Sequence, residues 1–199
     1  MATDAVRFLV EFARRPKEIG AIAPSSRSLA ERIVVPVPKG GNPLVVELGP
    51  GTGVFTDAIR RRLGGRGHQV AVEINQTLAA QLAACQQGVE VVNGDACTVD
   101  RLVADRGYDH ANVVISGLPW SLFPHAAQTG ILDAVTKSLA PDGSFSTFAY
   151  LHALWMPHAR RFKANLDERF EEVVMTRAVW ANLPPALVYH CRRPVRSGV

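Results

Sequence analysis

The chain has 199 residues, of which 47% are hydrophobic and 20% are charged, and its formal net charge is +4. These proportions fit a globular domain with a full hydrophobic core, and they exclude a disordered chain, a collagen-like repeat and a disulfide scaffold. The mild excess of positive charge favours anionic partners, and it leaves nucleic acid, nucleotides and acidic lipids open.

The cysteines and the N-terminus indicate a reducing compartment. Cys85, Cys97 and Cys191 are widely spaced and form no C-x-x-C pair, so neither a disulfide framework nor a zinc site is expected. Charged side chains interrupt the first 20 residues, which therefore lack the apolar core of a signal peptide. The six histidines show no metal-ligand spacing, and no metal is expected. We expect a cytoplasmic protein.

Residues 5–17 have the periodicity of a basic amphipathic helix. The apolar positions fall on one continuous arc and the charged positions on the other: Val6, Phe8, Leu9, Val10, Phe12 and Ala13 against Arg7, Glu11, Arg14 and Arg15. Such a helix can lie in a lipid interface with its arginines at anionic headgroups. It can also pack on the domain as a lid over a ligand, and both roles stay open.

Strands and helices alternate after a Pro- and Gly-rich linker at residues 36–43. Short apolar runs bounded by Gly or Pro predict buried strands, and longer runs with helical spacing predict helices. The expected strands are 44–48, 69–73, 89–92, 111–115 and 144–149, and the expected helices are 52–63, 76–86, 126–139 and 157–166. Two further β-prone runs, 170–180 and 187–191, predict a terminal hairpin. The pattern predicts an N-terminal arm and linker, 1–43, and an α/β domain, 44–199, with a mostly parallel seven-stranded sheet and a C-terminal antiparallel hairpin.

The segment V-V-E-L-G-P-G-T-G lies where the first expected strand passes into a helix. Gly49, Gly51 and Gly53 allow a tight turn and the close approach of a ligand to the backbone, and the following helix directs its first amides towards that ligand. The dinucleotide fingerprint G-x-G-x-x-G is the competing interpretation, but here Val54 stands where its third glycine or alanine is expected. The acid Glu47 suits a ligand with a cationic group better than a pyrophosphate.

The ends of the next three strands also carry acidic or small residues. Glu73 closes the second strand, where a carboxylate can accept both hydroxyls of a ribose. Asp95 and Ala96 follow the third strand, where Asp95 can accept from an adenine amino group and a neighbouring backbone amide can bind the ring. Ser116 begins the sequence S-G-L-P-W after the fourth strand. Together these strand ends predict one nucleoside-shaped crevice at the carboxyl edge of the sheet.

In the order of these motifs the chain resembles the class I S-adenosylmethionine-dependent methyltransferases. The match runs from E-x-G-x-G-x-G through the ribose acid and G-D-A to the fourth-strand loop, within residues 44–150. The resemblance implies a Rossmann-like sheet and S-adenosylmethionine as cofactor. It assigns the methionine part to Glu47, Gly49, Gly51 and Gly53, the ribose to Glu73, the adenine to Asp95 and Ala96, and the transfer point to Ser116, Gly117 and Leu118.

The fourth-strand loop separates substrate classes. DNA and rRNA adenine methyltransferases carry an Asn or Asp acceptor there and stack an aromatic ring on the flipped base. Gly117 stands at the acceptor position, which makes nucleic acid the less expected partner, while Trp120 can either stack on a base or pack as an apolar lid. The chain more closely resembles the small bacterial phospholipid N-methyltransferases, which convert phosphatidylethanolamine towards phosphatidylcholine. That resemblance is carried by I-G-A-I-A-P-S-S at 19–26, the S-G-L-P loop and N-L-P-P-A at 182–186.

The expected function is therefore methyl transfer to a phospholipid headgroup amine, by a cytoplasmic enzyme held peripherally on the anionic inner face of the membrane through residues 5–17. Tyr150 and His152 follow the fifth strand, where the resembled enzymes tend to have Tyr-Gly-Pro, and either can hold the amine or accept its proton. With Gly117 and Leu118 they are the candidate catalytic residues. An rRNA adenine or small-molecule N-methyltransferase and a non-catalytic S-adenosylmethionine-binding regulator are the alternatives.

Overall fold

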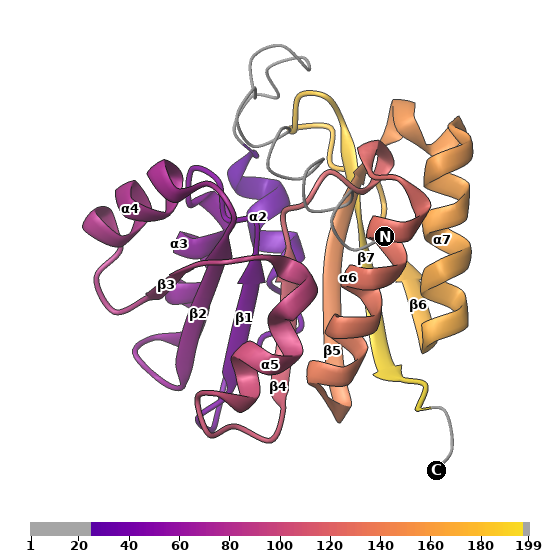
Figure 1. The fold of residues 1–199 in the computed structure, drawn as a ribbon. Helices are drawn as coiled ribbons and strands as arrows, with labels where there is room; N and C mark the ends of the chain where they lie inside the picture. Colours follow the sequence, from indigo (N-terminus) through magenta and orange to yellow (C-terminus); the bar gives the residue numbers. More distant parts are fainter. Residues whose placement is uncertain (1–24, 197–199) are drawn as a thin grey trace.

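The computed structural model describes residues 25–196, in which seven strands form one sheet in the order β3-β2-β1-β4-β5-β7-β6 (Figure 1). The strands are β1 (Leu44–Leu48), β2 (His68–Glu73), β3 (Glu90–Asn93), β4 (Ala111–Ser116), β5 (Leu139–Tyr150), β6 (Phe170–Met175) and β7 (Ala186–Pro194). Strands β1 to β5 pair in parallel, and β7 pairs antiparallel with both β5 and β6. The predicted fold, with its C-terminal antiparallel hairpin, is confirmed.

Helices cover both faces of this sheet. They are α2 (Arg27–Ile33), α3 (Val54–Leu63), α4 (Gln76–Cys85), α5 (Val99–Ala104), α6 (His125–Ser138) and α7 (Pro157–Arg169), with short 3₁₀ turns η1 (Ala96–Thr98), η2 (Trp120–Leu122) and η3 (Leu151–Trp155). Successive residues of β1 alternate between the two cores, because strand side chains alternate in direction. Val46 packs with residues of α5, α6 and α7, whereas Val45 packs with residues of α2 and α3. Burial on both faces explains why the strands read as continuous apolar runs.

Several elements differ from their predicted bounds, among them β5, which begins at Leu139 and not at Ser144. Helix α3 begins at Val54, because Gly53 adopts a left-handed conformation with φ +85° and caps the helix. Strand β6 ends at Met175, beyond which Val179 makes an isolated bridge to Ala186. The short helix α5 was not predicted, because six residues are too few to show a helical period.

Helix α2 lies in the segment that the sequence analysis assigned to the arm and linker. Its residues Leu29, Ala30 and Ile33 are fully buried, and α2 contacts α3 and β7. The described part of this segment therefore packs into the core of the sheet domain. The predicted amphipathic helix at residues 5–17 lies outside the described residues. Among the helices of residues 25–196, none is long and apolar enough to cross a membrane.

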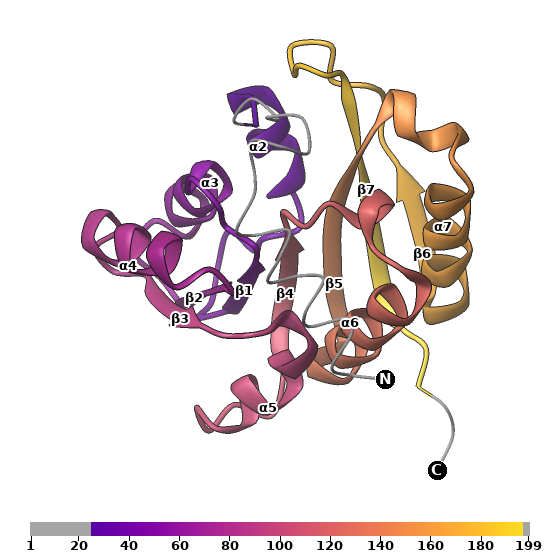
Figure 2. The ribbon, with the colours of Figure 1, turned by 45° about the horizontal axis from the view of Figure 1, so that its top comes forward.

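The carboxyl ends of the parallel strands meet at one edge of the sheet (Figure 2). The loops that follow β1, β2, β3, β4 and β5 leave the sheet there, as expected for a parallel α/β fold. The predicted site residues follow these strands in the sequence, so the topology collects them along this edge.

Candidate active site

Two glycine-containing loops pack directly against each other at the centre of this edge. The Gly117 amide donates to the carbonyl of Leu48 at 2.8 Å. A Cβ atom on Gly117 would lie 2.5 Å from the carbonyl oxygen of Gly49, and one on Gly49 would lie 2.6 Å from a methyl carbon of Leu118. Backbone without side chains is therefore required on both sides of this contact. This explains why the loop carries no Asn or Asp at position 117.

Glu73 ties the glycine loop to the second strand. Its carboxylate accepts from the Gly51 amide at 3.3 Å and from the Asn75 amide at 2.9 Å, one oxygen each. Burial raises the pKa of Glu73, although both amide hydrogen bonds oppose this effect. The carboxylate thus sits at the end of β2 beside the glycine loop, where the sequence predicts the ribose.

Glu47 is fully buried in β1, directly before the glycine loop. One carboxylate oxygen accepts from the Thr56 hydroxyl at 2.7 Å, and the other, Oε1, meets no hydrogen-bond partner among the described residues. Burial raises the pKa of Glu47 to about 8, since the interior favours the neutral form. A buried carboxyl with a free oxygen is suited to receive a cationic or hydrogen-bond-donating group of a ligand.

Asp95 and Ala96 begin the turn η1 after β3. An oxygen of the Asp95 side chain accepts from the Cys97 amide at 2.9 Å and caps the turn. Together with Gly49, Glu73 and Leu118, these two residues line a small crevice of about 30 Å³. The structure thus brings together the residues that the sequence assigned to ribose and adenine. Across residues 25–196, no three His, Cys, Asp or Glu side chains are grouped as a metal ion would require.

Ser116 and Trp120 brace the loop after β4 from inside. The Ser116 hydroxyl is fully buried and accepts from the Leu118 amide at 3.2 Å and from the Trp120 indole at 3.1 Å. The indole also donates to the Thr147 hydroxyl at 2.8 Å, and its ring stacks on Phe162 with centroids 4.6 Å apart. Trp120 therefore packs as an apolar element of the loop and is not free to stack on a base. Neither Thr147 nor Phe162 was found by sequence reasoning, because their contacts depend on the fold.

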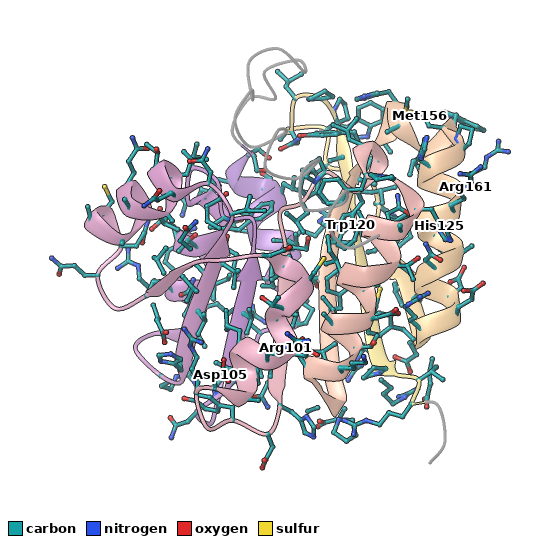
Figure 3. The ribbon with its side chains drawn as sticks, in the orientation of Figure 1. Arg101, Asp105, Trp120, His125, Met156 and Arg161 are labelled. Carbon is teal, nitrogen blue, oxygen red and sulfur yellow. The ribbon has the colours of Figure 1, made fainter. Side chains whose placement is uncertain are left out.

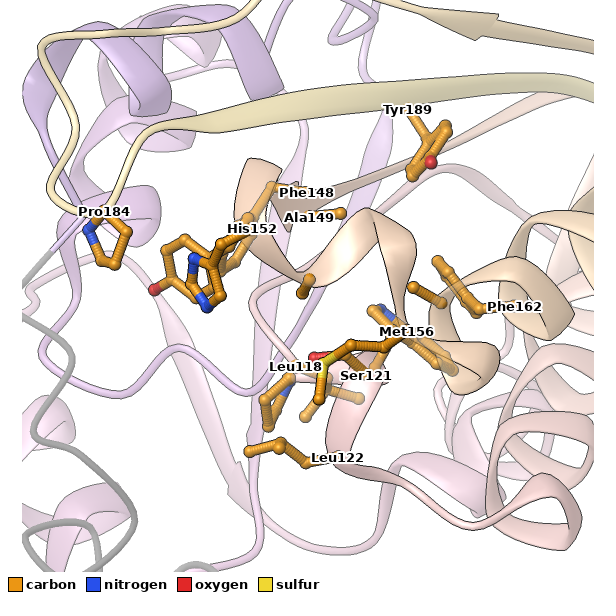
Figure 4. A pocket seen from close by; sticks show the side chains of 15 residues that line it. Leu118, Ser121, Leu122, Phe148, Ala149, His152, Met156, Phe162, Pro184 and Tyr189 are labelled. Atoms are coloured by element: carbon orange, nitrogen blue, oxygen red, sulfur yellow. The ribbon is translucent and has the colours of Figure 1, made fainter.

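A larger cavity of about 410 Å³ adjoins the crevice (Figure 4). Most of its lining is apolar or aromatic, and it comes from the β4 loop, the end of β5, η3, the start of α7, the β6–β7 loop and β7. Representative lining residues are Leu118, Leu122, Phe148, Met156, Phe162 and Tyr189. Leu118 also lines the small crevice, so the two spaces meet at this side chain. A reaction between a ligand in each space would take place beside Gly117 and Leu118.

Tyr150 and His152 both line this cavity, and their rings stack with centroids 5.7 Å apart. Burial raises the pKa of Tyr150 to about 12. The phenol therefore stays protonated at neutral pH, so it can hold a partner by hydrogen bonding but cannot serve as a base. The His152 ring is exposed at the cavity. Of the two residues, His152 is the one equipped to accept a proton.

Asn182 joins two motifs that are 156 residues apart. Its carbonyl oxygen accepts from the Ser26 amide at 2.7 Å, and its amide nitrogen donates to the Pro184 carbonyl at 2.7 Å. Ser26, the last residue of the first motif, therefore meets the segment 182–186 beside the cavity, since Pro184 lines it. The sequence singled out N-L-P-P-A without a role for its Asn, because no local pattern reveals this partner.

Replacing Asn182 with Ala is expected to lower the free energy of unfolding by about 1–3 kcal/mol, because a buried amide and a carbonyl lose their partners. Chemical denaturation of the purified protein measures this change. Asn42→Ala is the matched control, since Asn42 is exposed. Equal effects of the two substitutions would contradict a structural role for Asn182.

No family model matches the chain. It is 32% identical over 192 residues to the ornithine lipid N-methyltransferase of Singulisphaera acidiphila, across 95% of this chain and 96% of that protein. It is also 32% identical over 131 residues to ribosomal RNA small subunit methyltransferase A of a Polaromonas species, across 65% of this chain but 35% of that protein. The fold is similar to that of an S-adenosylmethionine-dependent O-methyltransferase from Thermotoga maritima, with a TM-score of 0.63 and 15% identity over 96% of this chain and 73% of that one.

Proposed function

Because the chain belongs to the class I S-adenosylmethionine-dependent methyltransferases, we propose that it transfers a methyl group to the amine of a lipid headgroup. One observation carries this proposal: the cavity that adjoins the cofactor crevice is large and mostly apolar. An apolar cavity accommodates the hydrocarbon next to a headgroup better than it accommodates a polar nucleotide. The name of the Singulisphaera acidiphila relative, an N-methyltransferase of a lipid, agrees with this choice.

The chemistry of the residues in and around the crevice suits S-adenosylmethionine, which supplies a methyl group activated by a sulfonium when it is bound. Glu47 offers a buried carboxyl with an unpaired oxygen for the methionine ammonium. The glycine loop leaves room for a ligand against the backbone, Glu73 offers two carboxylate oxygens for the ribose, and Asp95 and Ala96 line the place proposed for the adenine. These residues hold and orient the cofactor, while Gly117 and Leu118 exclude water beside the methyl group.

The acceptor amine has to lose a proton before it can attack. We assign His152 as the group that accepts this proton, because its imidazole is exposed in the cavity and Tyr150 stays protonated at neutral pH. The Tyr150 hydroxyl holds the amine as a hydrogen-bond partner. Its ring face also stabilises the cation that forms as methyl groups accumulate.

Substitution of His152 by Ala is expected to lower kcat at neutral pH by about a hundredfold, a typical contribution of a positioned base. The pH profile separates this role from a structural one, because the variant should recover activity at high pH, where the amine is already neutral. His158→Ala serves as the matched control, since His158 is exposed and outside the cavity lining. An unchanged rate and profile would assign the proton to another group.

Two acceptors are proposed, phosphatidylethanolamine and ornithine lipid, and both present an amine close to acyl chains. Methyl-labelled S-adenosylmethionine is incubated with the protein and with vesicles of either lipid or with ribosomal RNA, and the label is then located. Label on a lipid amine is expected, and the two vesicle types identify the preferred acceptor. Label in RNA with none in lipid would overturn the proposal, and binding of the cofactor without turnover on any of the three would favour a regulator.

We further propose that the enzyme works peripherally on the cytoplasmic face of the membrane, with residues 5–17 as its basic amphipathic contact. Deletion of residues 1–17 is expected to weaken binding to anionic vesicles more than binding of S-adenosylmethionine, because the deleted segment carries arginines and apolar side chains together. Vesicle sedimentation and calorimetry measure the two affinities. An equal loss of both would favour the role of a lid.

A further inference from the structure

Large apolar side chains are exposed together at the carboxyl edge of the sheet. Trp155 is 79% exposed, and Trp180 and Leu183 are each 74% exposed. With the partly exposed Met156 they form what we call the apolar rim. Trp155 ends η3 and Met156 directly follows it, whereas Trp180 and Leu183 belong to the β6–β7 loop. The two segments touch, because the Leu151 amide donates to the Pro185 carbonyl at 2.9 Å.

The apolar rim borders the mouth of the proposed lipid cavity. Met156 and Pro184, one from each segment, line that cavity (Figure 4). Exposed tryptophans in a cluster are costly in water, and such clusters mark sites of interaction. Trp is favoured where an apolar surface meets polar groups, above all at the interface of a bilayer.

The two segments that carry the apolar rim contain charges of one sign, and the nearby acid Glu31 of α2 is paired with Arg27. Residues 151–161 and 176–186 contain Arg160, Arg161 and Arg177 but no Asp or Glu. All three arginines are exposed, and their guanidinium groups form no ion pair with any acid of residues 25–196. At 1.5 Å per residue, Arg160 and Arg161 lie about 6–8 Å along α7 from Met156. Figure 3 labels Met156 and Arg161 at this end of α7. When the apolar residues lie at the acyl boundary, arginines at this distance from them lie at the level of the lipid headgroups.

The acids of the same elements lie away from the apolar rim. Asp167 and Glu168 are in the last turn of α7, and Glu171 and Glu172 begin β6, at the opposite end of the helix and strand. A second copy of the chain would bring its own unpaired arginines against these arginines across a two-fold interface, which disfavours self-association here. An anionic lipid surface complements both the apolar and the basic groups.

We propose that the apolar rim docks on an anionic bilayer, with Trp155, Trp180 and Leu183 at the boundary of headgroups and acyl chains and the three arginines at lipid phosphates. This inference rests on the proposed function, because docking serves a lipid substrate by opening the cavity mouth directly onto the membrane. A lipid then enters without leaving the bilayer. None of the residues of this contact belongs to the predicted helix at residues 5–17.

The test uses the full chain and vesicles of phosphatidylcholine with phosphatidylglycerol, which contain no acceptor amine. The paired substitutions W155S with W180S are expected to lower vesicle affinity about tenfold or more through lost apolar contact. The pair R160E with R161E is expected to lower it similarly and to reduce its salt dependence. The controls at the opposite end of the molecule are V195S, which replaces another exposed apolar residue, and R101E, which replaces another exposed arginine (Figure 3).

Cofactor affinity and methylation of acceptor lipid in detergent micelles should stay unchanged in the paired variants, because none of their positions lines the crevice or the cavity. Vesicle affinity equal to that of the unsubstituted chain would overturn the proposal. So would a change from dimer to monomer with vesicle affinity intact, since the apolar rim would then be a protein interface. The paired variants could lose vesicle binding while the unsubstituted chain methylates no lipid in micelles. That result would support the docking surface and refute only the proposed function.

Discussion

Gly117→Asn is expected to lower both cofactor affinity and turnover by about a hundredfold or more, although it installs the side chain that adenine methyltransferases use. A Cβ at position 117 would lie 2.5 Å from the carbonyl oxygen of Gly49, a backbone atom that cannot rotate away. The glycine loop would have to move, and with it the Gly51 amide that donates to Glu73. A displacement of this size at a cofactor loop costs both binding and alignment.

Calorimetry with S-adenosylmethionine and a lipid methylation assay measure the two losses separately. Gly40→Asn is the control, because no atom lies within 4 Å of a Cβ at Gly40 and its φ is not positive. Gly117→Ala should already show most of the effect, since the clash involves Cβ alone. A Gly117→Asn variant that binds cofactor normally and methylates RNA adenine would show that the loop can relax and that the missing acceptor, rather than packing, sets the substrate class.

Glu47→Gln is expected to weaken cofactor binding by about tenfold to a hundredfold, because a neutral amide cannot pair with an ammonium group as a carboxylate can. The same substitution should change how the stability of the ligand-free protein depends on pH. Burial raises the folded-state pKa of Glu47 from the ordinary 4.5 to about 8, so folding favours the protonated form. This contribution to stability is complete below the ordinary pKa and is lost as pH rises through about 8.

Between about pH 6 and about pH 9 the ligand-free parent should therefore lose more stability than the Gln variant does. Denaturant unfolding at both pH values checks this, and calorimetry in buffers of different ionisation enthalpy reports the proton released when the parent binds cofactor. Glu168→Gln is the control, because Glu168 is exposed. A parent without this pH dependence would mean that Glu47 is already ionised in the ligand-free protein.

The strands and the site edge were predictable because their causes are local. Buried parallel strands read as short apolar runs such as residues 44–48, and the glycine spacing after β1 follows from the tight turn there. The ends of parallel strands share one edge, so the placement of Glu73 and Asp95 beside the glycine loop followed from their positions after β2 and β3. Helix α5 was not predictable, since six residues are too few to show a helical period. The end of β6 was not predictable, since the β-prone residues continue past Met175 to the bridge at Val179.

The sequence by itself determined the order of the motifs at the strand ends, because glycine spacing, strand period and the acid at each strand end are properties of adjacent residues. That order carried the resemblance to the methyltransferases, which in turn implied the cofactor. Tertiary structure alone decided the rest. It enclosed Trp120 between Phe162 and two hydroxyls, joined Asn182 to Ser26, and stacked the rings of Tyr150 and His152 in the wall of the larger cavity. Burial, pKa and contacts between distant residues depend on the path of the whole chain, and no local pattern contains that path.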